Sequence, residues 1–268
     1  MPFRVELVRQ LKRRRTMVMG GVLAALPVIL LIAFQVGGDP GGNNNRVNLM
    51  DTATASGANF AAVNLFSGAG FLLVIPVALF CGDTVASEAS WSSLRYLLAA
   101  PVPRARLLQS KLAVGLTLSL AAMVLLPVVA LVVGTAAYGW GPLQLPTGGT
   151  LPTGTAAQRL LIVVAYIMVS QLVTAALAFW LSTRTDAPLG AVGGAVFLTI
   201  IGSVLDEVTA LGDWRHFLPA HWQYAWLGAV RPRLEWVDMI QGTSISVTYA
   251  LVLFALAFRG FARKDVVS

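Results

Sequence analysis

The side chains best suited to chemistry lie close together near residue 210. Asp206, Glu207, Asp213, His216 and His221 could supply an acid, a base or metal ligands. The two histidines are five residues apart, which puts them off a single helical face, and no ligand cluster accompanies them. We therefore expect no metal site, and a solvated loop is the simpler interpretation of these residues.

Motifs that carry common enzymatic activities are missing from the sequence. A P-loop requires a Gly-Lys pair, but the three lysines follow Leu11, Ser110 and Arg263. The zinc motif HExxH does not occur, and no Gly-x-Ser-Gly lies within an apolar stretch. We expect this chain to have no catalytic residue and no cofactor of its own. Energy for any uphill process would then come from a partner.

Composition indicates a membrane protein. The 268 residues are 57% apolar and 12% charged, whereas soluble proteins carry about 25% charged residues. The mean hydropathy is +0.75. The single cysteine, Cys81, excludes an internal disulfide. The net charge of +7 does not indicate nucleic-acid binding, because the basic residues cluster at the ends of apolar runs.

Six apolar stretches are long enough to cross a bilayer, which takes roughly 20 helical residues. None of them contains Asp, Glu, Lys, Arg or His. We predict an all-α integral membrane protein with six transmembrane helices in a single domain, residues 1–268. The predicted spans are Thr16–Val36, Phe60–Gly82, Leu112–Tyr138, Leu160–Leu181, Ala187–Leu205 and Met239–Phe258.

The basic residues predict how these spans are oriented. Fourteen lie in the N-terminal segment, the second and fourth connections and the tail, against five in the remaining connections. The richer side should be cytoplasmic, so we expect both termini in the cytoplasm. The first apolar run exceeds the roughly 7–15 residues of a signal-peptide core, so we expect it to be retained.

Residues 1–15 predict an amphipathic helix before the first span. Phe3, Leu7 and Leu11 recur at intervals of four residues and would form its apolar face. The opposite face would hold Glu6, Arg9, Lys12 and Arg13. Such a helix lies flat in the membrane interface. An ordinary basic tail is the alternative.

Few polar side chains lie at membrane depth. The notable ones are Asn64, Ser170, Gln171 and Thr174. Hydrogen bonds between helices are their default explanation, and the lining of a substrate path is the alternative. Proton-coupled carriers place ionisable residues within their spans, so we do not expect a proton relay here.

Residues 83–111 form the longest predicted cytoplasmic connection. Pro101 should end one short helix, and Pro103 should begin the next, which carries Arg104, Arg106 and Lys111. Exposed leucines among mixed charges suit the docking of a partner. Short helices that lie on the lipid headgroups are an equally good interpretation of this composition.

This connection resembles the first cytoplasmic loop of ABC-2 type transporter permeases. That loop carries an acidic residue, Gly-Thr/Ser-Leu-Arg, two leucines, Pro-Val-x-Arg, a leucine pair and a lysine. The residues that fit are Glu88, Leu94, Arg95, Leu97, Leu98, Pro101, Arg104, Leu107, Leu108 and Lys111. Ser92 stands where the family has glycine. The amphipathic start and the basic tail, Phe261–Asp265, are also similar to the family's elbow helix and ending.

The resemblance implies the permease subunit of a bacterial ABC exporter in the cytoplasmic membrane. Two ATP-binding subunits, which would hold ATP and Mg, and a second permease, identical or similar, would complete the transporter. A coupling helix between spans two and three and the elbow helix would both seat on the ATP-binding subunits. The implied docking residues are Glu88, Leu94, Arg95, Arg104 and Arg106, with Phe3, Leu7 and Leu11 in the elbow helix.

Two other functions stay open. The chain could be a membrane-embedded enzyme that acts on lipid, with its reactive groups in the cluster between Asp206 and His221, or an anchor or scaffold that transports nothing. The long outer segment, residues 206–238, holds Trp214, Trp222, Trp226 and Trp236. An aromatic belt explains these residues, and an interfacial or partly re-entrant helix, with Trp222 and Trp226 on one face, is the alternative.

Overall fold

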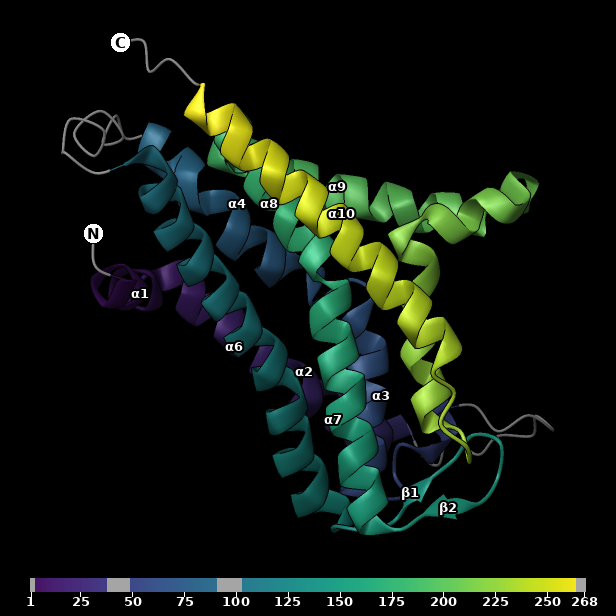
Figure 1. Ribbon diagram of the computed structural model, residues 1–268. Helices are drawn as coiled ribbons and strands as arrows, with labels where there is room; N and C mark the ends of the chain where they lie inside the picture. Colours follow the sequence, from purple (N-terminus) through teal and green to yellow (C-terminus); the bar gives the residue numbers. More distant parts are fainter. Residues whose placement is uncertain (1–2, 38–48, 91–102, 264–268) are drawn as a thin grey trace.

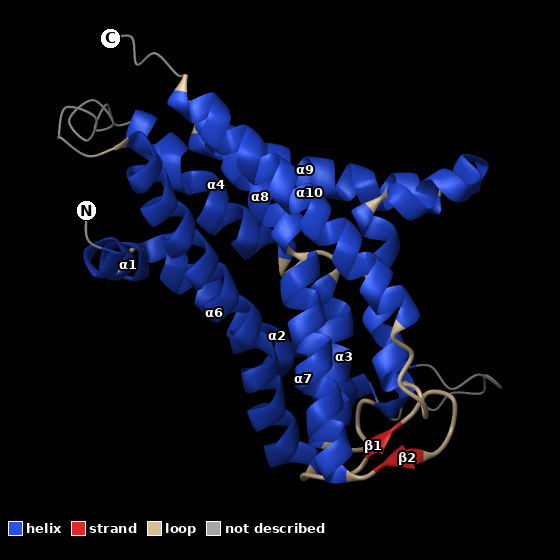
Figure 2. Cartoon of the chain, viewed as in Figure 1, coloured by secondary structure: helices blue, strands red, loops and turns tan. Residues whose placement is uncertain are grey.

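The computed structural model describes residues 3–37, 49–90 and 103–263 (Figure 1). In these ranges the chain is helical apart from loops and one short antiparallel pair of strands (Figure 2). The predicted all-α architecture is confirmed. The predicted amphipathic segment forms α1, Phe3–Leu11.

The long helices follow the predicted apolar stretches closely. Four are continuous: α2 (Arg14–Gly37), α6 (Arg104–Tyr138), α9 (Pro188–Glu207) and α10 (Val237–Ala262). The other two predicted spans are each divided, into α3 (Gly57–Ala69) with α4 (Val74–Ser90), and α7 (Thr153–Ser170) with α8 (Leu172–Arg184). In the described chain five helices, counting α7–α8 as one, could cross a membrane, or six if α3 and α4 make one crossing.

The two interruptions have different local causes. Between α3 and α4 the axis bends by 52°, over residues 70–73. Pro76 lies in the first turn of α4, where its missing N–H costs no helical hydrogen bond. Between α7 and α8 the single residue Gln171 separates the two assigned helices, and its backbone stays close to helical. One span is therefore sharply bent, whereas the other is only interrupted.

The helices pack in two groups that meet at these interruptions (Figure 1). In one group α2 and α3 both pack against α6. In the other α8 packs against α4, α9 and α10, and α4 also contacts α9. Where α4 crosses α8, the buried Ser182 hydroxyl accepts from the Val85 and Ala86 amides at 3.1 and 3.0 Å.

The end of the molecule opposite α1 is built from short elements. A 3₁₀ turn, η1 (Leu49–Thr52), lies near a hairpin of β1 (Leu143–Gln144) and β2 (Thr150–Leu151). The Asn59 side chain holds the hairpin to α3, because its amide donates to the Gln144 carbonyl at 2.8 Å and its oxygen accepts from the Gln144 amide at 2.9 Å. The Ser56 side chain caps the start of α3.

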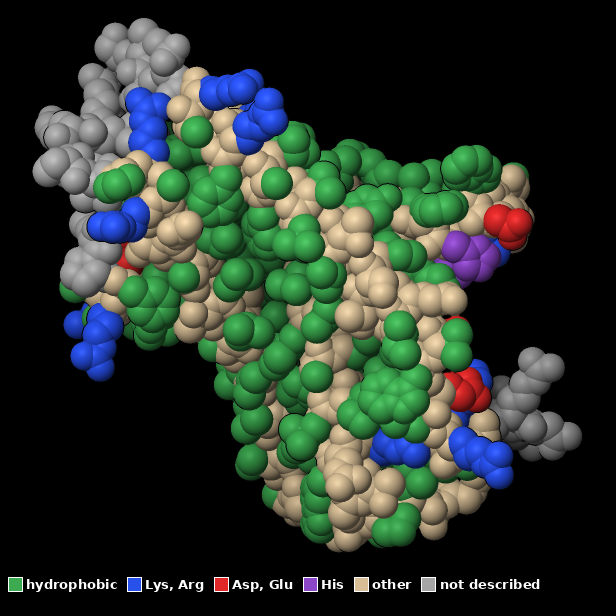
Figure 3. Space-filling view, in the orientation of Figure 1, with side chains coloured by type: hydrophobic (Ala, Val, Ile, Leu, Met, Phe, Trp, Pro, Cys, Tyr) green, Lys and Arg blue, Asp and Glu red, His purple; other side chains and the backbone are tan. Residues whose placement is uncertain are grey.

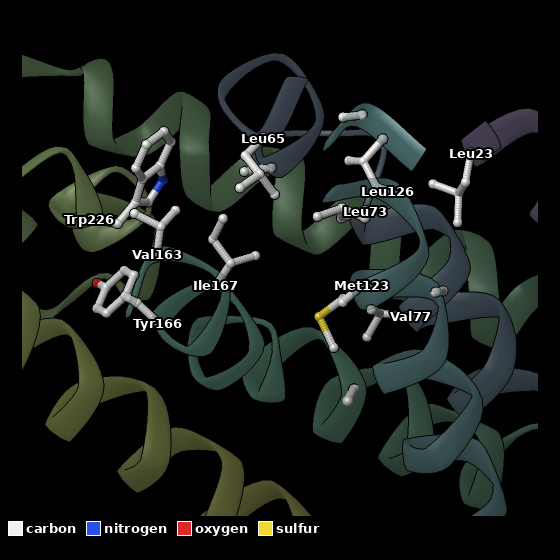
Figure 4. Close-up of a cluster of buried hydrophobic side chains, with 14 of the residues drawn as sticks. Leu23, Leu65, Leu73, Val77, Met123, Leu126, Val163, Tyr166, Ile167 and Trp226 are labelled. Atoms are coloured by element: carbon white, nitrogen blue, oxygen red, sulfur yellow. The ribbon is translucent and has the colours of Figure 1, made fainter. Parts of the chain in front are cut away.

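The outer segment differs from the single interfacial helix proposed as an alternative. It forms three 3₁₀ helices instead, η2 (Thr209–Phe217), η3 (Pro219–Trp222) and η4 (Ala225–Val230). Trp222 and Trp226 are buried in the protein, while Trp214 and Trp236 are exposed. An aromatic belt can therefore include only the second pair. Figure 4 shows Trp226 beside Val163, in the same cluster as Leu65 and Ile167.

The surface is that of a membrane protein. Large apolar side chains are exposed along α2, α6, α9 and α10, including Ile29, Val132, Phe197 and Leu251. Figure 3 shows this apolar surface over the helices, with Lys and Arg gathered at the two ends. A soluble protein does not expose apolar patches of this extent, whereas lipid tails solvate them.

Candidate functional site

Four charged side chains from three elements meet at the end of the molecule that holds α1. The Lys111 ammonium of α6 lies 3.2 Å from the Glu88 carboxylate of α4 and 3.9 Å from the Glu6 carboxylate of α1. The Arg9 guanidinium of α1 contacts Glu88 and lies 2.8 Å from Glu6. We call Glu6, Arg9, Glu88 and Lys111 the buried quartet. It connects α1, α4 and α6.

The quartet is electrically neutral and mostly removed from water. Glu6 and Glu88 are each 3% exposed and Lys111 is 4% exposed, whereas the Arg9 side chain is 35% exposed and closes the cluster toward solvent. Burial by itself lowers the pKa of Arg9, but its hydrogen bonds to Glu6 and Glu88 and the attraction of both carboxylates outweigh that effect, so the net pKa is raised. Buried charges persist only when they are paired, and here two cations compensate two anions.

A second group of charges fixes the start of α2 beside the quartet. The Asp83 carboxylate of α4 lies 3.0 Å from the Arg13 guanidinium and also contacts Arg15. Gln10 connects the two groups, because its amide donates to Glu6 at 3.1 Å and its oxygen accepts from Arg15 at 3.5 Å. The turn between α1 and α2 is thus held against α4 by charge.

The elbow helix has a different orientation from a simple interfacial helix. Its predicted polar face points to water only in part, because Glu6 is buried against the bundle with the neighbouring Gln10, while Arg9 and Arg13 are half-buried and Lys12 is exposed. Phe3 and Leu11 are exposed, and Leu7 packs partly against the core. The sequence contained a signal for this arrangement, since Glu6 is the only acidic residue among residues 1–15.

The predicted docking residues do not share one environment. Arg104 and Arg106 are exposed at the start of α6, and Arg104 donates to the Ala262 carbonyl at the end of α10 at 3.4 Å. Leu94 and Arg95 lie outside the described residues. Glu88 is buried and paired with Arg9 and Lys111, and its docking role stays a prediction. Its ion pairs connect α4 to α1 and α6.

Of the polar residues predicted at membrane depth, Ser170, Gln171 and Thr174 lie at or near the interruption between α7 and α8, whereas Asn64 lies within α3. The Gln171 amide, between α7 and α8, donates to the Ala69 carbonyl at the end of α3 at 3.2 Å. The Gln171 side chain, at one interruption, therefore supplies a hydrogen bond to a backbone carbonyl at the other. A backbone group that lacks a helical partner at membrane depth needs such a donor. The Asn64 amide donates to the Phe60 carbonyl of its own helix at 2.9 Å.

A pocket of about 370 Å³ adjoins this crossing. Gln171, Thr174 and Ser170 line one side, and residues of α9, α10 and η3 line the others. Most of the remaining wall is apolar, with side chains such as Leu198, Leu205 and Leu253. The structure thus places Gln171 and Thr174 at one cavity, whereas Asn64 is not among its lining residues.

The outer acidic and histidine residues come partly together. His221 Nδ1 lies 2.6 Å from Asp206 Oδ1, and the His216 and His221 rings are 4.8 Å apart. The five-residue spacing predicted that the two histidines lie on different faces of one helix. That prediction is wrong, because η2 and η3 fold back on each other and bring the rings together. In residues 3–37, 49–90 and 103–263, no three His, Cys, Asp or Glu side chains form a group that could hold a metal ion.

Fold and surface together define an all-α membrane protein with a charged junction at one end and two interrupted helices at its centre. The chain belongs to a family of proteins of unknown function, DUF2705, whose profile matches residues 41–267. The match begins after α1 and α2. In the charged junction, where the buried quartet and the Asp83 ion pairs lie, it therefore includes α4 and α6 but not α1 and α2. A comparison with curated proteins found no match to the chain.

Proposed function

We propose that this chain is the permease subunit of an ABC-2 type transporter and that a separate ATPase drives it through residues 91–102. The observation that supports this function best is the buried quartet. It joins the helix that enters this segment, α4, to the helix that leaves it, α6, and joins both to α1. A force on the segment would therefore move three elements as one body.

In the proposed topology, α3–α4 and α7–α8 each make one crossing, giving six crossings in all. The charged junction, the start of α6 and the end of α10 would lie in the cytoplasm of a bacterial cell. The hydrogen bond from Arg104 to Ala262 supports this arrangement, because it brings the connection after α4 and the C-terminal end of α10 to the same end of the molecule.

The partners in this proposal are two ATP-binding subunits, which carry ATP and Mg, and a second permease, identical or similar. Arg104 and Arg106 are exposed at the start of α6, and Leu94 and Arg95 are proposed to act with them in docking. Export is the proposed direction. The pocket beside Gln171 and Thr174 is the best-supported location for a polar step in the translocation path.

Charge reversal tests the proposed docking. The variant with Arg95→Glu and Arg104→Glu, purified from its native membrane in mild detergent, should lose most of a co-purifying subunit that carries a P-loop. Arg233→Glu, an equally exposed residue between η4 and α10, should retain it. If both variants retain the subunit and its ATP hydrolysis equally, the docking assignment is wrong.

The pair of His221 and Asp206 favours one alternative, a lipid-processing enzyme at the outer surface, since a carboxylate can orient a histidine base. Replacement of both His216 and His221 with alanine separates the two functions. An enzyme should lose all turnover, whereas a permease should keep its transport and its ATPase coupling.

A further inference from the structure

A second cationic feature lies at the ends of α8 and α10, apart from the buried quartet. A hollow of about 510 Å³ is lined by Thr183, Arg184, Leu256, Arg259, Gly260 and Arg263. We call it the arginine hollow. No acidic side chain is among these described lining residues, and its volume lies within the range of about 300–1,000 Å³ of small-ligand sites.

The three arginines are brought together by packing. Arg259 lies in the last turn of α10, and Arg263, four residues on, directly follows the helix with near-helical backbone, so the two lie on one side. Arg184 crosses from α8 to meet them, because Gly260 has no side chain there: a Cβ at that position would lie 3.2 Å from the Arg184 guanidinium. The Trp180 ring supports Arg184 from the other side, 5.9 Å from its central carbon.

These guanidinium groups are not neutralised within the described chain. The ion pairs there involve Arg9, Arg13, Arg15, Lys111, His221 and Arg231, and none involves Arg184, Arg259 or Arg263. Three like charges around one hollow repel each other, so an anion that bridges them would stabilise the arrangement. Guanidinium groups bind phosphate particularly well, through paired hydrogen bonds.

The position of the hollow identifies the source of that anion. Arg259 follows directly on an apolar run of α10, and Arg184 ends α8, so both lie where the hydrophobic thickness ends. Leu251, Val252 and Leu256 are exposed on the adjoining turns of α10 and offer an apolar surface for acyl chains. A charged headgroup and an apolar tail would thus both be accommodated.

We propose that the arginine hollow binds the phosphate headgroup of an anionic phospholipid. The lipid would hold the ends of α8 and α10 together at the membrane surface. This inference requires only that the chain spans a membrane, so it stands or fails independently of an ATP-driven partner.

Lipid retention in nanodiscs tests the proposal. The protein is assembled with equal amounts of phosphatidylglycerol and phosphatidylcholine, and the lipid that stays bound is counted by native mass spectrometry. The wild-type chain should retain phosphatidylglycerol selectively. Combined Arg184→Gln and Arg263→Gln substitutions should weaken that retention by about tenfold, because each removes a charge-assisted hydrogen bond. Should this variant not assemble, Arg259→Gln alone should weaken it in the same direction.

Two matched variants separate a built site from general attraction. Combined Arg4→Gln and Arg233→Gln removes the same charge from exposed positions outside the hollow and should leave retention unchanged. Gly260→Leu keeps every charge but displaces the Arg184 guanidinium, so it should weaken retention. Equal losses in the control and the hollow variant would overturn the proposal. Displacement of the lipid by millimolar inorganic phosphate would also overturn it, in favour of a soluble anion.

Discussion

At the scale of single residues, the charged side chains of this apolar chain serve two purposes. Exposed arginines at the helix ends are available to partners or lipid, whereas Glu6, Glu88 and Lys111 are sequestered and paired. Arg104 and Arg106, which the resemblance implies as docking residues, are exposed. The sequence could not reveal the ion pairs of Glu88, because the partners of that carboxylate lie 79 and 23 positions away in the chain.

Replacement of Lys111 should show how much the buried quartet contributes to the stability of the protein. Lys111→Met leaves two buried carboxylates with only Arg9, so we expect a loss of about 3 kcal/mol in stability, as for other broken buried ion pairs. Combining Lys111→Met with Glu88→Gln restores neutrality and should recover most of the loss. Unfolding in detergent, followed by intrinsic tryptophan fluorescence, measures both. A single variant as stable as the wild type would mean that the pairs are not coupled.

Gln171 offers a second test at this scale. Gln171→Leu removes the donor to the Ala69 carbonyl and should cost about 1–2 kcal/mol, because a buried acceptor is left unpaired. The matched control is Gln241→Leu, which alters an exposed amide on α10 and should have little effect. The difference in unfolding midpoint between these variants is the informative quantity. Equal midpoints would rule out the proposed bridge between the interruptions.

At the scale of elements, apolar runs were sufficient to locate the spans, because helix length is set by bilayer thickness. Pro76 predicts a bend in the second span, and the structure bends just before it, over residues 70–73; the interruption at Gln171 was not predicted. Gln171 is no helix breaker, and the bend before α4 depends on tertiary packing: α3 packs mainly against α6, whereas α4 packs against α8 and α9 as well as α6. The fold of η2, η3 and η4 could not be predicted from residue spacing either. Trp222 and Trp226 have the spacing of one helix face, but their burial in the protein decides the local structure.

The close contact between α3 and α6 requires a residue without a side chain at Gly57. A Cβ at Gly57 would lie 2.8 Å from the Thr135 amide nitrogen and 2.9 Å from its Cα. Because backbone cannot yield as a side chain does, Gly57→Ala should separate the helices and cost about 1–3 kcal/mol. At Gly21, in α2, a Cβ would have no neighbour within 4 Å, so Gly21→Ala should leave the unfolding temperature unchanged or slightly raised. Similar losses in both would refute the proposed close approach.

At the scale of the whole molecule, the arrangement suggests how a force at one end could reach the centre. The buried quartet joins α1, α4 and α6 at the charged junction, and α4 leads from there to the bend that meets Gln171. Movement of the junction would therefore be passed along α4 to the place where the two helix interruptions meet. This coupling has meaning only if the junction faces the compartment that contains ATP.

Labelling from one side of the membrane tests this requirement most directly. Arg106→Cys places a thiol at the exposed start of α6, and Thr147→Cys places one in the exposed hairpin. The native Cys81 is fully buried, so the unmodified chain serves as the control. A membrane-impermeant maleimide added to intact cells should label Thr147→Cys and leave Arg106→Cys unmodified until the membrane is opened. Labelling of Arg106→Cys in intact cells would place the junction outside, beyond reach of a cytoplasmic ATPase, and would contradict the proposed function.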